Sequence, residues 1–218
     1  MNESLKENKN GIEFAKEIVS EINKKVKKVY WTNDEIDKWF GKRSAKEIFD
    51  SGTACFMNPC LDLNLASGYL IASRNIPYTL IIEELLPTKD FNFDKSNLVL
   101  KYFNFNRLHF TLEFQDTEGK YVINHKRENE VHIFKGEYGG RKDIPVAQII
   151  KIPGEKINPD KPIYKNLGYG SLEDLIKNQF KGYSLEENLE RLKKDNSLEN
   201  YEHYKKRYGE KVKIIITP

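Results

Sequence analysis

The sequence predicts an α+β fold in which helices come first and a mostly antiparallel sheet follows. Apolar residues recur at helical spacing through residues 11–26, and a second amphipathic stretch begins at Cys60. From Tyr78 onward, short runs rich in apolar residues are separated by turn residues, which is typical of strands. Three capped helical stretches then lead to a short final strand, so we expect a helical C-terminal extension.

Four helices are expected before the sheet. Thr32 or Asn33 can cap the second, and Ser44 with Glu47 forms a capping box for the third. Gly52 breaks the third helix before the Cys60 helix begins. The expected helices cover residues 11–26, 32–39, 44–49 and 60–74.

Six strands are expected in the middle of the chain, the third and fourth forming a hairpin about Asp116-Thr117-Glu118-Gly119. They are residues 78–85, 98–105, 108–114, 120–123, 131–134 and 147–152. The proline-bearing loop from Pro153 to Pro162 is the expected boundary. This predicts N-terminal helices over 1–50, a core over 51–152 and an extension over 153–218. In the extension, helices begin near Ser171, Ser184 and Ser197, and the last strand is 212–216.

The composition is that of a soluble globular protein. Of 218 residues, 39% are hydrophobic and 32% are charged, and a formal net charge of +3 predicts neither a nucleic-acid nor a membrane partner. The first ten residues lack the apolar core of a signal peptide, and no apolar run approaches the roughly 20 residues of a membrane span. Two cysteines give no disulfide framework and no four-ligand zinc pattern. We therefore expect a cytoplasmic protein that needs no cofactor.

Cys60 is the candidate nucleophile. Asn58 suits the N-cap and Pro59 the first helical position, so Cys60 falls in the first turn of its helix. There the free N–H groups and the helix dipole favour an anion, which lowers the pKa of a thiol and favours the reactive thiolate. Cys55 competes for the role, but the residues that follow it do not continue a helix.

His109 and Asn124 are the candidate partners of the thiolate. Alternation along residues 108–114 places His109, Thr111 and Glu113 on a polar face, where the imidazole could meet the head of a helix packed there. An imidazolium beside the thiolate stabilises both and can later protonate a leaving amine. Asn124 follows at an interval that also suits a cysteine-nucleophile enzyme.

Residues 53–134 resemble the transglutaminase-like branch of the papain-like cysteine enzymes. The family's cysteine precedes a Gly-Ile-Pro-like turn by the interval that separates Cys60 from Asn75-Ile76-Pro77, and its histidine opens a strand like His109-Phe110-Thr111-Leu112-Glu113-Phe114. The third member, normally Asp, falls on Asn124 at the end of the next strand, and the resemblance implies that Asn124 orients the ring of His109 by accepting from its second N–H. The resemblance implies a papain-like core, a Cys-His-Asn triad, and a protein or peptide substrate that is hydrolysed or transferred to an amine.

A second branch of the same superfamily, the arylamine N-acetyltransferases, fits less of the sequence. Asn64 and Asp62 match residues that this branch places after its cysteine, but Asn58-Pro59 stands where it has paired glycines.

Other functions and roles remain open from the sequence. The chain could be a catalytically silent relative that binds proteins, or a purely structural protein in which Cys60 is a buried apolar residue. A metal site would need a compact ligand spacing, which the two cysteines and four histidines do not show. His125 is expected at the surface because alternation separates it from Asn124, and Glu83-Glu84 is expected to be a solvated strand end.

Overall fold

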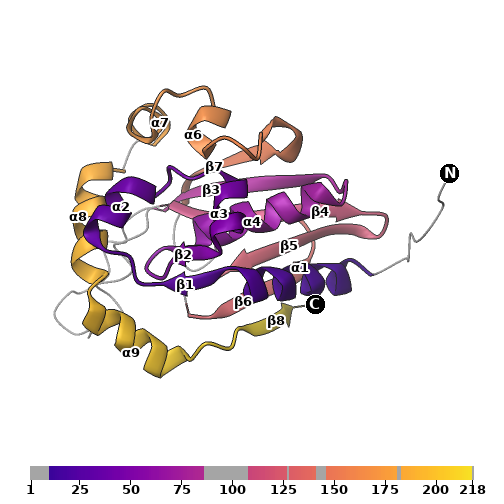
Figure 1. Ribbon diagram of the computed structural model, residues 1–218. Helices are drawn as coiled ribbons and strands as arrows, with labels where there is room; N and C mark the ends of the chain where they lie inside the picture. The colour runs from indigo at the N-terminus through magenta and orange to yellow at the C-terminus, as the bar shows by residue number, and fades with distance from the viewer. Residues whose placement is uncertain (1–9, 86–107, 127, 141–145, 181–182, 218) are drawn as a thin grey trace.

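The computed structural model describes residues 10–85, 108–126, 128–140, 146–180 and 183–217. These residues form eight α-helices, a parallel pair of short strands and a six-stranded sheet, which confirms the predicted α+β class (Figure 1). The short pair consists of β1 (Lys27–Val29) and β2 (Thr53–Cys55), neither of which the sequence predicted. The expected strand over 98–105 lies outside the described residues.

The six-stranded sheet has the order β7-β3-β4-β5-β6-β8. Neighbouring strands are antiparallel except β6 and β8, which pair in parallel. The sheet is therefore mixed, not purely antiparallel. Its strands are β3 (Tyr78–Leu85), β4 (Leu108–Asp116), β5 (Gly119–His125), β6 (Glu130–Lys135), β7 (Val146–Pro153) and β8 (Lys213–Thr217).

The helices before the sheet begin where their capping residues predict. Thr32 and Ser44 each form a complete capping box with a glutamate three residues later, and Gly52 ends the third helix in the left-handed conformation with φ 65°. These helices are α1 (Gly11–Lys25), α2 (Asn33–Trp39), α3 (Ala45–Ser51) and α4 (Pro59–Ser73).

One face of the sheet is covered by α1 and α4 (Figure 1). Phe14 of α1 meets Phe114 edge-on at 5.2 Å between ring centroids, and α4 packs closely because Gly68 has no side chain. A Cβ atom at Gly68 would lie 2.7 Å from the Tyr78 ring. The opposite face carries a smaller apolar cluster of Ile81, Val122 and Tyr138. Both faces of the central strands are therefore buried.

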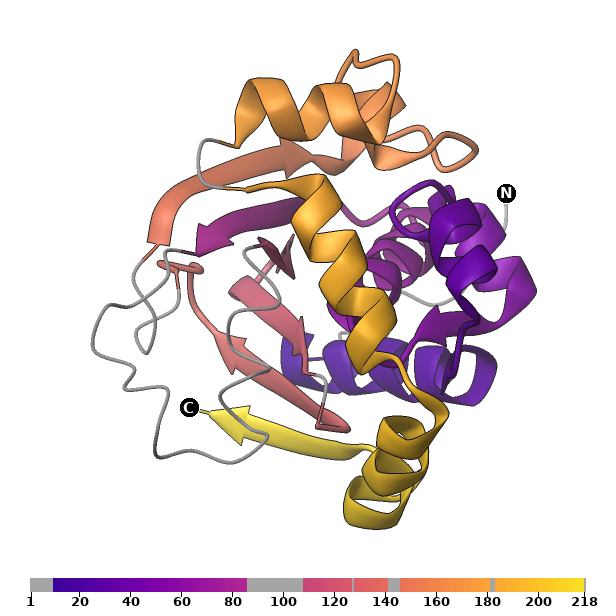
Figure 2. The same ribbon diagram turned by 90° about the vertical axis from the view of Figure 1, so that its left-hand side faces the viewer.

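The C-terminal third is integrated into this architecture. Its helices are α6 (Ile163–Asn166), α7 (Leu172–Gln179), α8 (Leu185–Asp195) and α9 (Leu198–Tyr208), preceded by a 3-10 turn, η1, at Gly154–Lys156. Ser171, Ser184 and Ser197 cap the last three helices, as predicted. Figure 2 shows α8 and α9 running along one end of the molecule from α7 to β8. Leu192 and Tyr204 join a cluster built around Trp31 and Phe56.

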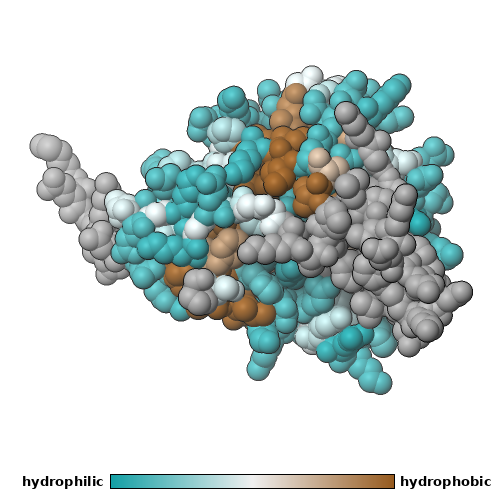
Figure 3. Space-filling model, turned by 180° about the vertical axis from the view of Figure 1, so that it is seen from behind, coloured by the Kyte–Doolittle hydropathy of each residue, from teal (hydrophilic) through white to brown (hydrophobic). Residues whose placement is uncertain are grey.

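Of the four large apolar side chains that are exposed in the described residues, three lie on the two edge strands, and the fourth is Leu198 of α9. Ile149 of β7 is 39% exposed, and Ile216 of β8 is 43% exposed. Figure 3 shows two separate apolar areas that correspond to these edges. Within the described ranges, no helix has the length and apolar character needed to cross a bilayer.

Candidate active site

The start of α4 holds Cys60 in a fixed setting. Pro59 occupies the first helical position, as predicted, and Asn58 the N-cap position, but the Asn58 side chain does not cap the helix. Its Oδ1 instead accepts a hydrogen bond from the Cys60 thiol at 3.1 Å. Cys60 is 6% exposed, so the sulfur is almost wholly enclosed and in contact with an amide. The sequence did not single out Asn58 as a neighbour of the sulfur.

Asn64 ties the first turn of α4 to the sheet. Its Nδ2 donates to the carbonyl of Cys60 at 2.7 Å and to the carbonyl of Phe110 at 2.8 Å. The ladder between β4 and β5 runs from Asp116 opposite Gly119 to Leu112 opposite Ile123, and Phe110 lies beyond that end. The head of α4 therefore meets the sheet beyond the end of that ladder. This contact gives the asparagine four residues after the cysteine a physical role.

His109 and Asn124 are in direct contact, as the sequence analysis expected. The Asn124 Oδ1 accepts a hydrogen bond from the His109 Nε2–H at 2.9 Å, and both residues are only 6% exposed. This bond fixes the ring plane and, for a neutral ring, places the proton on Nε2. His109 directly precedes Phe110 in β4. Asn64 therefore anchors the first turn of α4 to the residue next to His109.

The expectation that the helix packs on the polar face of β4 is wrong. The body of α4 packs on the face that carries Phe110 and Leu112, as the close approach of Gly68 to Leu112 shows. His109, Thr111 and Glu113 point to the opposite face by alternation. The apolar side chains determine which face α4 covers. Packing leucines and phenylalanines against α4 removes far more apolar surface from water than packing a histidine and a glutamate there would.

Two buried carboxylates, Glu83 and Glu113, lie on the face of the sheet to which His109 points. Glu83, directly opposite His109 on β3, is 0% exposed and accepts from the Tyr138 hydroxyl at 2.7 Å. The Tyr138 N–H donates to Glu113 at 3.0 Å. Glu84 is also buried, at 2% exposed. The prediction of a solvated Glu83-Glu84 strand end is therefore wrong, since the sequence does not reveal that β3 is a central strand.

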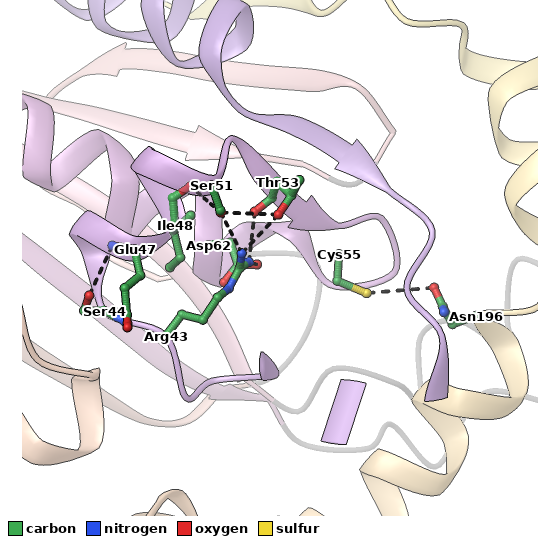
Figure 4. Close-up of polar contacts among 9 residues, drawn as sticks. All are labelled: Arg43, Ser44, Glu47, Ile48, Ser51, Thr53, Cys55, Asp62 and Asn196. Carbon is green, nitrogen blue, oxygen red and sulfur yellow. Dashed lines mark hydrogen bonds and ion pairs between the residues drawn. The ribbon is translucent and has the colours of Figure 1, made fainter. Parts of the chain in front are cut away.

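A buried ion pair supports the first turn of α4 from behind (Figure 4). Arg43 Nη2 lies 2.6 Å from Asp62 Oδ2, and the two side chains are 8% and 6% exposed. Arg43 also donates to Ser51 and Thr53 and stacks over Trp31 at 4.7 Å. Burial raises the pKa of the Asp62 carboxyl, and Arg43 opposes that rise. The pairing neutralises an acid that would otherwise repel a thiolate two residues away.

Cys55 lies in a different environment from Cys60. It is 1% exposed in the cluster around Trp31, and its Sγ donates to Asn196 Oδ1 at 3.9 Å (Figure 4). Burial raises the pKa of the Cys55 thiol to about 12. Both cysteines are free thiols. Cys55 is therefore held in the unreactive protonated form.

We expect iodoacetamide to alkylate Cys60 near pH 6 and to leave Cys55 unmodified, because the thiolate is the reactive form and Cys55 does not reach it below about pH 8. Intact-mass spectrometry of the Cys55→Ala and Cys60→Ala variants over a pH series measures each thiol alone. Equal rates for the two thiols, each rising only above about pH 8, would contradict an activated Cys60.

His125 is not at the surface, contrary to the prediction. It is 1% exposed, and its Nε2 lies 3.0 Å from the Ser67 hydroxyl of α4. Burial lowers the pKa of His125 to about 3, with a smaller contribution from the charge of Lys28. Alternation correctly separates His125 from Asn124, but both faces of β5 are covered. His125 is a structural residue that joins α4 to the sheet.

Comparison with known proteins finds no matching family, no matching curated protein and no matching solved structure. Among the described residues, no three His, Cys, Asp or Glu side chains are grouped so that they could hold a metal ion.

Proposed function

We propose that this protein is a transglutaminase-like cysteine hydrolase or acyltransferase that acts on an amide or related acyl bond. The observation that carries the proposal is the Asn64 bridge. The Asn64 amide nitrogen donates to the carbonyls of Cys60 and Phe110, so the candidate nucleophile is anchored to β4, the strand that bears His109, and His109 is bonded in turn to Asn124 of β5. The spacing of Cys60, His109 and Asn124 in the sequence supports the same reading.

In the proposed reaction the Cys60 thiolate attacks the acyl carbon, and the bond from that carbon to nitrogen or oxygen breaks. The imidazolium of His109 gives its proton to the departing amine, which leaves a thioester on Cys60. Water or an amine then attacks the thioester while His109 takes its proton, the carbon–sulfur bond breaks, and the Cys60 thiolate is regenerated. Water as acceptor makes the protein a protease or amidase, and an amine makes it a transferase.

Asn58 is the proposed side-chain donor of the oxyanion hole. It lies just upstream of Cys60, touches the sulfur, and is 5% exposed. Its amide can turn its Nδ2 toward an oxyanion that forms beside the sulfur, next to the backbone N–H of Cys60. A cavity of about 20 Å³ lies beside Asn58, so a small acyl group is the appropriate probe.

Asn124→Asp is expected to retain most of the acylation rate, because aspartate accepts the same hydrogen bond from His109. Asn124→Leu is expected to lose at least about tenfold, because the buried His109 N–H then has no acceptor at that position. Single-turnover release of nitrophenolate from p-nitrophenyl acetate measures both rates. If Asn124→Leu acylates as fast as the unaltered protein, Asn124 is not the third member of a triad.

A second function is a catalytically silent protein-binding module of the same fold. Two observations favour it. The Cys60 thiol donates a hydrogen bond to Asn58, as a protonated thiol does. The body of α4 covers the face of β4 that lies opposite to the one to which His109 points. The two functions differ in one measurable respect. The reference is the rate at which p-nitrophenyl acetate acylates Cys60 in Cys55→Ala protein that is unfolded in denaturant. In a hydrolase or transferase the folded protein is acylated faster than this reference, and in a silent module it is not.

A further inference from the structure

A cavity of about 290 Å³ shares no lining residue with the cavity beside Asn58. It is formed by the end of α1, strand β1, the turn between β5 and β6, and α9 with the segment that follows it. Val26, Leu63 and Val212 supply an apolar floor. Its volume is near the lower end of the range for small-molecule pockets, about 300–1,000 Å³.

The polar groups that line the cavity are mostly positive. Three lysines, Lys27, Lys28 and Lys205, face one carboxylate, Glu210, which leaves a net charge of +2. Within the described part of the chain, neither Lys27 nor Lys205 forms an ion pair with a carboxylate. Lys27 Nζ donates to the Asn23 carbonyl at 2.6 Å, and Lys205 Nζ lies 5.3 Å from the centre of the Tyr201 ring. An ammonium group has three donors, so these contacts leave donors for a ligand.

The wall of the cavity is fixed by hydrogen bonds. Asn129, at the turn between β5 and β6, accepts from the Tyr204 hydroxyl at 2.6 Å and donates to the carbonyl of Gly209. It adopts the left-handed conformation with φ 56°, which asparagine tolerates better than most residues. These bonds join Asn129 to Tyr204 within α9 and to Gly209 at the C-terminal end of that helix. The cavity is therefore a preformed feature of the fold.

The positive charge of Lys28 also acts on the buried residue His125. Lys28 donates to the Lys126 carbonyl at 2.7 Å, and its charge contributes to the lowered pKa of His125. Burial is the main cause of that low pKa, about 3, so His125 is neutral at physiological pH and adds no positive charge. The positive charge of the site is carried by the lysines at the rim.

We propose that this cavity binds a phosphate monoester carried on a compact ring or other apolar body. A phosphate monoester bears about −1.5 to −2 charges at pH 7, which matches the net charge of the lining groups. Its oxygens would accept from Lys27 and Lys205, and its apolar body would cover the floor at Val26 and Leu63. The proposal goes beyond the proposed acyl chemistry and does not depend on it, because Cys60 does not line the cavity.

Phenyl phosphate is the probe, with inorganic phosphate and phenol as its two halves. In isothermal titration calorimetry at low salt, we expect phenyl phosphate to bind more tightly than inorganic phosphate, and phenol to give no measurable binding. Added salt is expected to weaken the binding of both anions. The proposal is overturned if phenyl phosphate does not bind, or if phenol binds as tightly as phenyl phosphate does.

Single-charge variants locate the binding. Lys27→Gln and Lys205→Gln are each expected to weaken phenyl phosphate binding about fivefold, and Glu210→Gln to strengthen it by a similar factor. Lys206→Gln is the matched control, because it removes the same charge from the next residue of α9, which does not line the cavity. Equal affinities for Lys205→Gln and Lys206→Gln would overturn the proposal. Cys60→Ser is expected to bind normally, which separates this site from the acyl site.

Discussion

His109→Gln is expected to slow acylation of Cys60 at least about a thousandfold, the scale of loss seen when a member of a catalytic triad is removed. Glutamine can still donate a hydrogen bond to the Asn124 Oδ1, which His109 Nε2 reaches at 2.9 Å. It cannot take or give a proton at neutral pH. The substitution therefore removes acid–base chemistry and retains the buried hydrogen bond, so the fold is expected to survive.

The measurement is single-turnover acylation by p-nitrophenyl acetate, followed at the nitrophenolate absorbance, together with a thermal melt. His203→Gln is the matched control, because His203 is an exposed residue of α9. An unchanged acylation rate in His109→Gln would remove His109 from the mechanism and favour the silent binding module. A melting temperature that falls sharply would instead identify His109 as a structural residue.

Arg43→Leu is expected to destabilise the protein by about 3–5 kcal/mol. The Asp62 carboxylate pairs with Arg43 at 2.6 Å and is only 6% exposed, so the variant leaves a buried charge without its partner. Burial already raises the pKa of Asp62, and the loss of Arg43 removes the group that opposes this rise. Because the pKa of the folded state then exceeds that of the unfolded state, the variant's stability falls as pH rises and recovers toward acid.

Urea denaturation at several pH values measures this effect. Lys46→Leu removes one partner of an exposed ion pair, in which Lys46 lies 3.9 Å from Asp160, and is expected to cost less than about 0.5 kcal/mol. The double variant Arg43→Leu with Asp62→Leu is expected to recover much of the lost stability, because no charge stays buried. A loss below about 1 kcal/mol in Arg43→Leu would show that water reaches Asp62.

Local chemistry predicted the boundaries of the elements well. The capping residues Thr32, Ser44 and Ser184 start helices where expected, and β3 spans the residues that its apolar run indicated. These features depend on hydrogen bonds within a few residues, which a single sequence displays directly. The contact between His109 and Asn124 was expected from the family resemblance, and alternation along the two neighbouring strands is consistent with it.

The features that the sequence did not reveal depend on contacts between distant segments. Alternation separates the two faces of a strand, but it does not say which face a helix covers or whether both are covered. His125 and Glu83 were expected in solvent and are buried for this reason. The ion pair between Arg43 and Asp62 and the contact of Asn64 with Phe110 link positions 19 and 46 residues apart, and no local pattern predicts such pairs.

The parallel pairing of β8 with β6 has a consequence for how the protein is made. Among the described residues, β8, formed by residues 213–217, is the strand that covers that edge of β6, and the chain between them passes through β7 and the helices α6 to α9. While a ribosome synthesises the chain, β6 presents Val131 and Ile133 along an open edge until these last residues emerge. An open apolar strand edge is a template for pairing with other chains. Truncation before residue 213 should therefore yield aggregates during expression, even though every residue of the candidate active site has already been made.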